Sequence, residues 1–335
     1  MKISLPLPDL SGERLSFYRQ IGVEAVTVPR RYSETFTGRS PKPLVPPAQT
    51  GPAGPQPRPP DAAELSRICA RVRAFDLEPL AAGVAVSRRI LHGEAGRDED
   101  VERLCRSLEV MGQAGLQVVN WNFTALRASE GYAMAAGAGR GGAGYRDFDA
   151  ARLTGLPPLP EVGAHSADQM WERLAWLLER IVPVAAAAGL RLAIHPNDPP
   201  VREYRGVAQP LCDRAAMGRL VELADHPANS LYLDTGVATE WGEDAAAVIE
   251  DFGARDRIAA VHLRNVRVQS PRERYTEAFL DEGDGDAVAW MRALHGVGYA
   301  GPVDPDHVPH LTGDTEDLRA GWAWAVSHLR ALRQG

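Results

Sequence analysis

The sequence predicts an α/β protein in which eight parallel strands close into a single (β/α)₈ TIM barrel. Strand-like apolar segments alternate with helix-like segments along the chain, which is the pattern of a parallel sheet with crossover helices. The chain has 335 residues, a length that suits one barrel of about 250 residues with insertions. We therefore expect one barrel domain spanning residues 1–335.

The eight expected strands are short apolar runs, and the helices between them begin at residues that favour helix N-caps. The strands are Lys2–Leu7, Ala25–Pro29, Glu78–Ala85, Leu116–Phe123, Leu190–Pro196, Ser230–Val237, Ile258–Val266 and Gly301–Asp306. The helices are expected to begin near Gly12, Asp61, Asp98, Ser166, Asp213, Asp244 and Asp286, with a last one from Asp314. Asp and Ser favour these positions because their side-chain oxygens accept from unpaired backbone N–H groups. Glycines within Ala188–Leu190 and Val297–Tyr299 suit helix C-caps.

Two segments interrupt this alternation. Residues 41–60 are rich in Pro and Gly and follow the second strand, whereas the Gly-rich residues 131–144 follow the fourth. Both are expected to be loop insertions on the side of the barrel where its strands end, and long loops there can act as lids. A plain surface loop is the alternative for each.

Composition narrows the classes of function. The chain is 44% hydrophobic with a net charge of −7 and no basic run, which argues against nucleic-acid binding. Its three cysteines, Cys69, Cys105 and Cys212, lack metal-binding spacing and are expected to be free thiols. No signal-peptide core or run of ~18 apolar residues is present. We expect a soluble, cytoplasmic protein without nucleic-acid or membrane partners, and leave homo-oligomer formation open.

Four polar residues stand near the ends of the last four expected strands: His195, Asp234, His262 and Asp306. Because the carboxyl ends of barrel strands converge on one mouth, these side chains are expected to meet there. A single polar residue at a strand end usually caps the barrel, so the prediction rests on the group. Two imidazoles and two carboxylates without a thiolate suit Mn²⁺ best, with Mg²⁺, Co²⁺, Fe²⁺ or Zn²⁺ as alternatives. The chain is therefore predicted to be a metal-dependent enzyme.

Two histidines near these four residues are candidates for proton transfer. His307 directly follows Asp306, and His310 comes three residues later. Either imidazole could act as a general acid or base near neutral pH. His307 is the first candidate because it is nearest the expected ligand, although it could instead orient a ligand through a hydrogen bond.

The candidates for substrate binding are Arg264, Asn265, Asn120, Asn122 and Arg140. Arg264 and Asn265 follow His262 closely, where a guanidinium could clamp a carboxylate. Asn120 and Asn122 have the period of two that places strand side chains on one face. Arg140 could close over an anion or stay solvated in its loop.

Residues 277–286 form an acidic run. We expect most of this run to be solvated, with Asp286 capping the following helix. Glu277 could instead accept a proton or orient His262.

The motifs around these residues resemble those of the mannonate dehydratases, in the xylose-isomerase-like TIM barrel superfamily. They are HPNDPP at 195–200, DTG at 234–236, HLRNV at 262–266, EAFLDEGDGD at 277–286, PDH at 305–307 and, more weakly, VVNWNF at 118–123. The resemblance implies metal ligation by His195, His262 and Asp306, and catalysis by His307. The family typically has Cys where this chain has Asp234, and a carboxylate there favours the harder ions Mn²⁺ and Mg²⁺.

The chain departs from the family at three places. Ser87 stands in place of the family's third-strand histidine, TALR at 124–127 replaces a DWTR pattern, and the insertion that supplies a tyrosine after the PDH motif is missing. The first interpretation is a lyase that converts D-mannonate into 2-keto-3-deoxy-D-gluconate and water. A sugar isomerase or epimerase with the same metal centre is the alternative, and a non-catalytic barrel that binds a sugar acid is the third.

Overall fold

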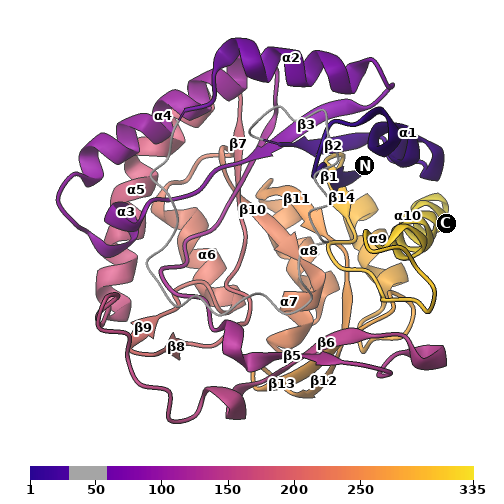
Figure 1. The fold of residues 1–335 in the computed structure, drawn as a ribbon. Coiled ribbons are helices and arrows are strands. Elements are labelled where there is room, and N and C mark those ends of the chain that lie inside the picture. Colours follow the sequence, from indigo (N-terminus) through magenta and orange to yellow (C-terminus); the bar gives the residue numbers. More distant parts are fainter. Residues whose placement is uncertain (30–58) are drawn as a thin grey trace.

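The computed structural model describes residues 1–29 and 59–335 and contains a closed barrel of eight parallel strands surrounded by helices (Figure 1). Around the barrel the strand order is β1-β14-β11-β10-β7-β4-β3-β2. The strands are β1 (Lys2–Pro6), β2 (Ala25–Val28), β3 (Glu78–Gly83), β4 (Val118–Trp121), β7 (Arg191–Ile194), β10 (Asn229–Asp234), β11 (Ile258–His262) and β14 (Pro302–Asp304). Each overlaps an expected strand, so the predicted barrel is confirmed.

The helices pack outside the barrel, and all except α3 and α7 begin within five residues of the expected positions. They are α1 (Gly12–Ile21), α2 (Ala62–Arg73), α3 (Arg88–His92), α4 (Arg97–Gln113), α5 (Ala167–Ala187), α6 (Arg214–Leu223), α7 (Thr235–Glu240), α8 (Ala245–Ala254), α9 (Ala287–Gly296) and α10 (Arg319–Gln334). Ser166 and Gln169 form a capping box on α5. α10 begins five residues after the expected Asp314, yet the Asp314 carboxylate accepts from the backbone N–H groups of Ala320 and Gly321, at 2.8 and 2.9 Å.

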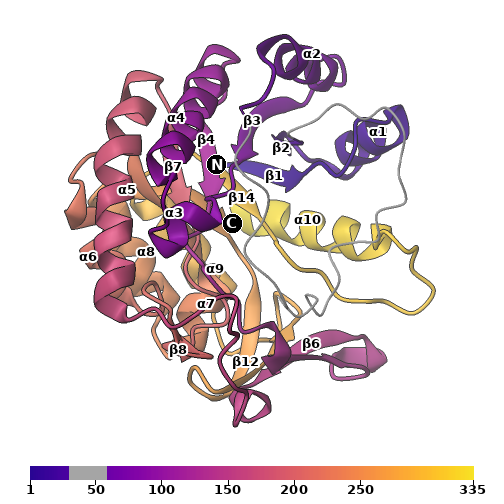
Figure 2. The same cartoon turned by 60° about the vertical axis from the view of Figure 1, so that its left-hand side comes forward.

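A second, antiparallel sheet was not predicted. Its strand order is β12-β13-β6-β5, and its strands are β5 (Tyr132–Ala135), β6 (Tyr145–Asp149), β12 (Asn265–Ser270) and β13 (Arg274–Ala278). It lies at one end of the barrel (Figures 1 and 2). β12 starts three residues after the end of β11, so this is the end at which the barrel strands terminate. A two-stranded sheet, β8 (Glu203–Tyr204) and β9 (Val207–Ala208), lies in the segment after β7.

The antiparallel sheet corrects the expectation for residues 131–144. Tyr132–Ala135 form strand β5 instead of a loop, because Tyr132 packs with Phe148, Val266 and Tyr275 in a small apolar core of the sheet. The remaining residues up to 144 contain a short 3₁₀ helix at Arg140–Gly142. The expected insertion at 41–60 lies outside the described residues except for its last two.

Most of the buried apolar side chains of the barrel belong to two clusters. The main core lies between the strands and the surrounding helices. A smaller cluster is built mainly from alanines together with Tyr232: Ala81, Val118, Ala193, Tyr232, Ala259 and Ala260. Of the three free cysteines, Cys69 and Cys212 are buried and Cys105 is partly exposed. No helix in the described residues has the length and apolarity needed to span a membrane.

Candidate metal centre and proton-transfer site

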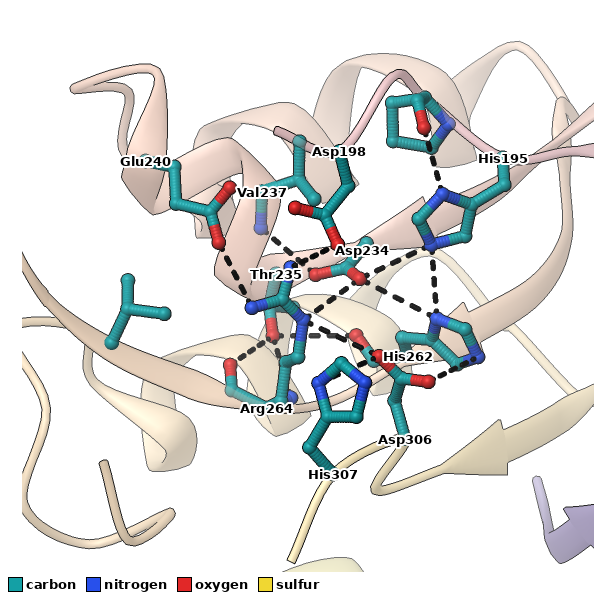
Figure 3. Close-up of polar contacts among 12 residues, drawn as sticks. His195, Asp198, Asp234, Thr235, Val237, Glu240, His262, Arg264, Asp306 and His307 are labelled. Carbon is teal, nitrogen blue, oxygen red and sulfur yellow. Dashed lines mark hydrogen bonds and ion pairs between the residues drawn. The ribbon is translucent and has the colours of Figure 1, made fainter. Parts of the chain in front are cut away.

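Three of the four predicted ligands meet at the barrel mouth. His195 follows β7, Asp234 ends β10 and His262 ends β11; Asp234 and His262 are register partners on adjacent strands. His195 Nε2 lies 3.3 Å from Asp234 Oδ2 and 3.1 Å from His262 Nδ1, and His262 Nδ1 lies 3.4 Å from Asp234 Oδ2 (Figure 3). Within the described residues this is the group of His, Cys, Asp and Glu side chains that could hold a metal ion.

The two imidazoles are held so that the converging nitrogens can act as ligands. His195 Nδ1 donates to the carbonyl oxygen of Pro196 at 2.8 Å, which leaves the Nε2 lone pair free for a metal. His262 Nε2 lies 3.7 Å from the carboxylate oxygen Oδ1 of Asp306. The ring proton therefore belongs on Nε2, which leaves Nδ1 free to face the cluster. Tyr232 packs against the His262 ring, with the ring centroids 3.9 Å apart.

The Asp234 carboxylate is fixed through both oxygens. Oδ1 accepts from the backbone N–H of Val237 at 2.8 Å and thereby caps α7, and Oδ2 accepts from Arg264 Nε at 2.9 Å. Burial opposes ionisation, but Arg264 and the neighbouring histidines outweigh it and hold the pKa of Asp234 well below its usual range. Gly236 leaves room for Arg264, since a Cβ there would lie 2.7 Å from its guanidinium carbon.

These three atoms fit a divalent ion. Their separations of 3.1–3.4 Å define a triangle whose centre lies about 1.9 Å from each atom, slightly less than the ~2.0–2.2 Å of typical metal–ligand bonds. His195, Asp234 and His262 could therefore hold one divalent ion together. Two neutral imidazoles and one carboxylate form a donor set for a borderline or hard ion.

Asp306 lies beside this triangle. Its carboxylate approaches His262 from the ring nitrogen opposite the cluster, and its other oxygen lies 3.2 Å from His307 Nδ1. The backbone of Asp306 is left-handed, with φ 53°, and its N–H donates to Asp304 Oδ1 at 2.7 Å. This conformation turns the segment after β14 back over the mouth, and metal ligation by Asp306 stays a prediction.

His307 is almost buried against the antiparallel sheet. Its Nδ1 lies 2.8 Å from Glu277 Oε1 of β13 and 3.4 Å from Arg146 Nη2 of β6. Burial and the Arg146 charge lower the pKa of His307, against the opposing effect of Asp306 and Glu277. The predicted catalytic imidazole therefore lies beside Asp306, near the three candidate ligands, within a network of charged residues from the sheet (Figure 3).

Arg264 forms the centre of that network. Its guanidinium is 3% exposed and donates to Asp234 and to Glu240 Oε1, each at 2.9 Å. Its nitrogens lie within 3.9 Å of carboxylates from Asp198, Asp234, Glu240, Glu277 and Asp306. The protein's own carboxylates thus surround this side chain, and substrate binding by Arg264 stays a prediction.

Asn265 makes structural contacts, and substrate binding by this side chain stays a prediction. Its Nδ2 donates to the carbonyl oxygens of Leu280 and Gly285, at 3.1 and 2.8 Å. Its Oδ1 accepts from the N–H groups of Val266 and Gly285. Because both ends of the amide are used, Asn265 holds residues 280–285 against the start of β12.

The other predicted substrate residues lie in different settings. Asn120 on β4 is partly buried and donates to Thr27 Oγ1 at 3.4 Å, whereas Asn122 is exposed. Arg140 is 44% exposed, lies 3.0 Å from Asp281 Oδ2 and stacks over Phe279. These contacts favour a surface ion pair for Arg140. Anion binding by this side chain stays untested.

The backbone of His310 pairs with that of Gly144. Its N–H and carbonyl oxygen both pair with Gly144, at 3.0 Å, so this residue joins the segment after β14 to the chain before β6. Within the described residues, its side chain is not part of the group formed by His195, Asp234 and His262. His307 is therefore the better placed of the two histidines.

Sequence reasoning missed several charged and hydroxyl side chains of this network. Asp198 accepts from Tyr132 and from Arg146, and Tyr132 and Tyr275 hydroxyls lie 3.1 Å apart. Asp198 lies in the HPNDPP motif, so the family resemblance could have identified it as a candidate site residue. Nothing local in the sequence marked Arg146, because its partners come from distant parts of the chain.

The fold and the site together define a parallel (β/α)₈ barrel with a metal-type ligand cluster where its strands end. The profile of the D-mannonate dehydratase (UxuA) family matches residues 161–332, just over half of the chain. The chain belongs to this family.

Similar proteins of known sequence carry the same family name. Mannonate dehydratase 2 of Halalkalibacterium halodurans is 32% identical over 151 residues, 44% of each protein. Mannonate dehydratase 1 of Bacillus licheniformis is 36% identical over 146 residues, 43% of this chain and 39% of that protein. The chain thus aligns with less than half the length of these relatives. Mannonate dehydratase of Streptococcus equi subsp. zooepidemicus is 29% identical over 259 residues, 69% of this chain and 70% of that protein.

Solved structures share the fold. The mannonate dehydratase from Streptococcus suis serotype 2 superposes with a TM-score of 0.81 at 22% identity, covering 100% of this chain and 93% of that one. D-psicose 3-epimerase from Clostridium cellulolyticum H10 superposes with a TM-score of 0.62 at 12% identity, covering 99% of both chains. These superpositions confirm the expected TIM barrel fold.

Proposed function

We propose that this protein is a divalent-metal-dependent hydro-lyase that removes water from a sugar acid, converting D-mannonate into 2-keto-3-deoxy-D-gluconate. The observation that carries the proposal is the convergence of His195, Asp234 and His262 in a chain of the mannonate dehydratase family. A donor set of this kind suits an ion that binds the oxygens of a hydroxy acid.

His195, Asp234 and His262 would hold the ion, with Asp306 as the candidate fourth ligand. When bound, the ion would polarise the substrate's carboxylate and α-hydroxyl and so acidify the proton on C2. Mn²⁺ is the first choice, because the carboxylate of Asp234 is a hard ligand and the described cluster contains no thiolate.

His307 would move the proton. The reaction removes hydrogen from C2 and hydroxyl from C3, which leave together as water, and the resulting enol becomes the 2-keto group. His307 either takes the C2 proton or protonates the leaving C3 hydroxyl, since its imidazole lies beside the candidate ligand Asp306.

A direct assay tests the proposal. Purified protein, loaded in turn with Mn²⁺, Mg²⁺, Co²⁺, Fe²⁺ and Zn²⁺, is incubated with hexonates, pentonates and free sugars, and products are identified by NMR and mass spectrometry. Loss of 18 mass units with formation of a 2-keto-3-deoxy acid is expected from D-mannonate. Asp234→Ala serves as the control that abolishes metal binding.

A sugar isomerase or epimerase is the second candidate, favoured by the absence of the family's tyrosine element after Asp306 and His307. This activity would need the same ion and proton transfer but no leaving hydroxyl. If a free sugar gives a product with the same mass as the substrate, the protein is an isomerase or epimerase and not a dehydratase. Tight sugar-acid binding without turnover under every metal would instead indicate a non-catalytic barrel.

A further inference from the structure

The antiparallel sheet positions a buried ion pair beside His307. Glu277 on β13 and Arg146 on β6 have side chains 3% and 2% exposed. Glu277 Oε1 accepts from Arg146 Nε at 2.7 Å and lies 2.8 Å from His307 Nδ1. One carboxylate oxygen therefore joins the sheet to the imidazole that the proposed function uses.

The contacts at Nδ1 decide which nitrogen of His307 carries the proton. A carboxylate oxygen at 2.8 Å is a hydrogen-bond acceptor, so it requires a hydrogen on Nδ1. Asp306 Oδ2, at 3.2 Å, makes the same demand. Arg146 Nη2 could donate to a bare Nδ1, but its distance of 3.4 Å is longer, and this nitrogen also bonds to Asp198. Two acceptors against one distant donor place the proton on Nδ1.

We propose that Glu277, itself held by Arg146, is a positioning residue that fixes His307 in its Nδ1–H tautomer. Nε2 is then the atom that exchanges a proton with the substrate. The inference rests on the proposed function for the role of His307, but the tautomer is a property of the protein alone. It replaces the sequence-based idea that Glu277 orients His262.

The electrostatics of the pair agree with this role. Burial alone raises the pKa of Glu277, but Arg146 and His307 lower it to about 2, so the carboxylate stays ionised and can only accept. Its second oxygen, Oε2, is buried and makes no hydrogen bond to a described residue. Glu277 therefore directs its acceptor capacity through Oε1, toward Arg146 and His307.

Arg146 is a further member of the site that the family profile does not cover. The profile matches residues 161–332, which include β13 but not β6. Register pairing of Tyr275 with Phe148 holds the two strands together and places Arg146 opposite Glu277 across the sheet. The segment before residue 161 thus contributes to the alignment of His307.

The test measures the tautomer directly, without any turnover. The full chain is labelled with ¹⁵N-histidine, metal-free and with Mg²⁺, and the His307 ring signals are assigned from their loss in His307→Gln. Long-range ¹H–¹⁵N spectra distinguish the two tautomers. Nδ1 protonation is expected in the parent protein, and protonation on Nε2 there would overturn the proposal.

Two variants extend the test. Glu277→Met removes the acceptor and should shift His307 toward the Nε2–H form, whereas Glu277→Gln retains a carbonyl oxygen and should restore the parent tautomer in part. An unchanged tautomer in Glu277→Met would overturn the proposal, since Asp306 alone would then suffice. If Glu277→Met does not fold, the parent spectrum and Glu277→Gln decide. Glu273→Gln, an exposed glutamate of the same hairpin, is the matched control.

Kinetics separate this inference from the proposed function. With D-mannonate, Glu277→Met should lower kcat by about 10²–10⁴-fold with little change in KM or metal affinity, as expected when an imidazole is held in the wrong tautomer. A merely structural role would lower the metal affinity as well. If the tautomer is as expected but no water is removed from any acid, the proposed function fails and the positioning role stands.

Discussion

Replacing Arg264 tests whether this guanidinium holds together the carboxylates at the barrel mouth. Arg264→Met removes the positive charge while keeping an unbranched apolar side chain. In the parent, Arg264 is 3% exposed and donates to Asp234 and Glu240, which are both buried. The variant leaves the ionised Asp234 carboxylate without its guanidinium in a region of low dielectric, whereas Glu240 can stay neutral because burial raises its pKa to about 8.

The magnitude follows from burial. Removing one partner of a buried ion pair costs about 3–5 kcal/mol, because the remaining charge is desolvated and uncompensated. Arg140→Met is the matched control, since Arg140 also lies beside two carboxylates, at 3.0 and 3.5 Å, but is 44% exposed. An exposed pair is worth about 0–1 kcal/mol, and the stacking on Phe279 adds about 0.5–1 kcal/mol.

Urea unfolding of the metal-free proteins at pH 7, followed by far-UV circular dichroism, measures both free energies of unfolding. Arg264→Met should lose at least about 2 kcal/mol more than Arg140→Met. Adding Asp234→Asn to Arg264→Met should recover about 1–3 kcal/mol in these metal-free proteins, because the uncompensated Asp234 charge is removed. Equal losses in the two single variants would refute the reasoning.

Three other substitutions test separate parts of the structure. Asn265→Ala should cost about 1–3 kcal/mol in urea unfolding, because carbonyl groups at 280 and 285 lose their buried donor; an unchanged midpoint would argue against its structural role. Gly236→Ala should weaken Mg²⁺ binding in calorimetry, because its Cβ would meet Arg264 at 2.7 Å, and parent-like affinity would contradict this. Burial lowers the pKa of His92 to about 4, so stability should fall as pH decreases from about 6.5 to about 4, where the unfolded chain takes up the proton first. His92→Asn should reduce this loss by no more than about 3 kcal/mol, and an identical pH dependence of the urea midpoint in parent and variant would exclude His92 as its source.

The barrel could be predicted from the sequence because its signals are local. Strand and helix segments alternate, and helix starts coincide with capping residues such as Ser166, whose side chain accepts from the Gln169 N–H. Helix α7 was missed because it begins directly after β10, with Asp234 as its N-cap. Helix α3 has only five residues, capped by Ser87, and was also missed. Asp234 had been considered only as a ligand, yet the same carboxylate also caps a helix.

The cluster at the barrel mouth could also be predicted, since it depends on strand ends in one parallel sheet. Parallel register places Asp234 beside His262, and period two places Tyr232 on the same face as Asp234. Applying that alternation would have identified Tyr232, which packs against the His262 ring. What the sequence could not give is the orientation of each ring, which depends on contacts such as that between His195 and the Pro196 carbonyl.

The antiparallel sheet was missed because its pairing is not local. Tyr275 on β13 pairs with Phe148 on β6, more than a hundred residues earlier. Without that pairing Arg146 is one arginine among many, and Glu277 is the first residue of an acidic run that looks solvated. The pairing buries both side chains and converts the start of the run into part of the site.

The two sheets supply different parts of the site, and Asp306 lies where they meet. Strand ends of the barrel present His195, Asp234 and His262 to one point, whereas the antiparallel sheet presents Glu277 to His307. Asp306 directs Oδ1 toward His262, at 3.7 Å, and Oδ2 toward His307, at 3.2 Å. One carboxylate therefore fixes the distance between the ion-binding cluster and the imidazole that moves the proton. Since the left-handed backbone at Asp306 sets the direction of that carboxylate, the turn after β14 determines how the two parts are aligned.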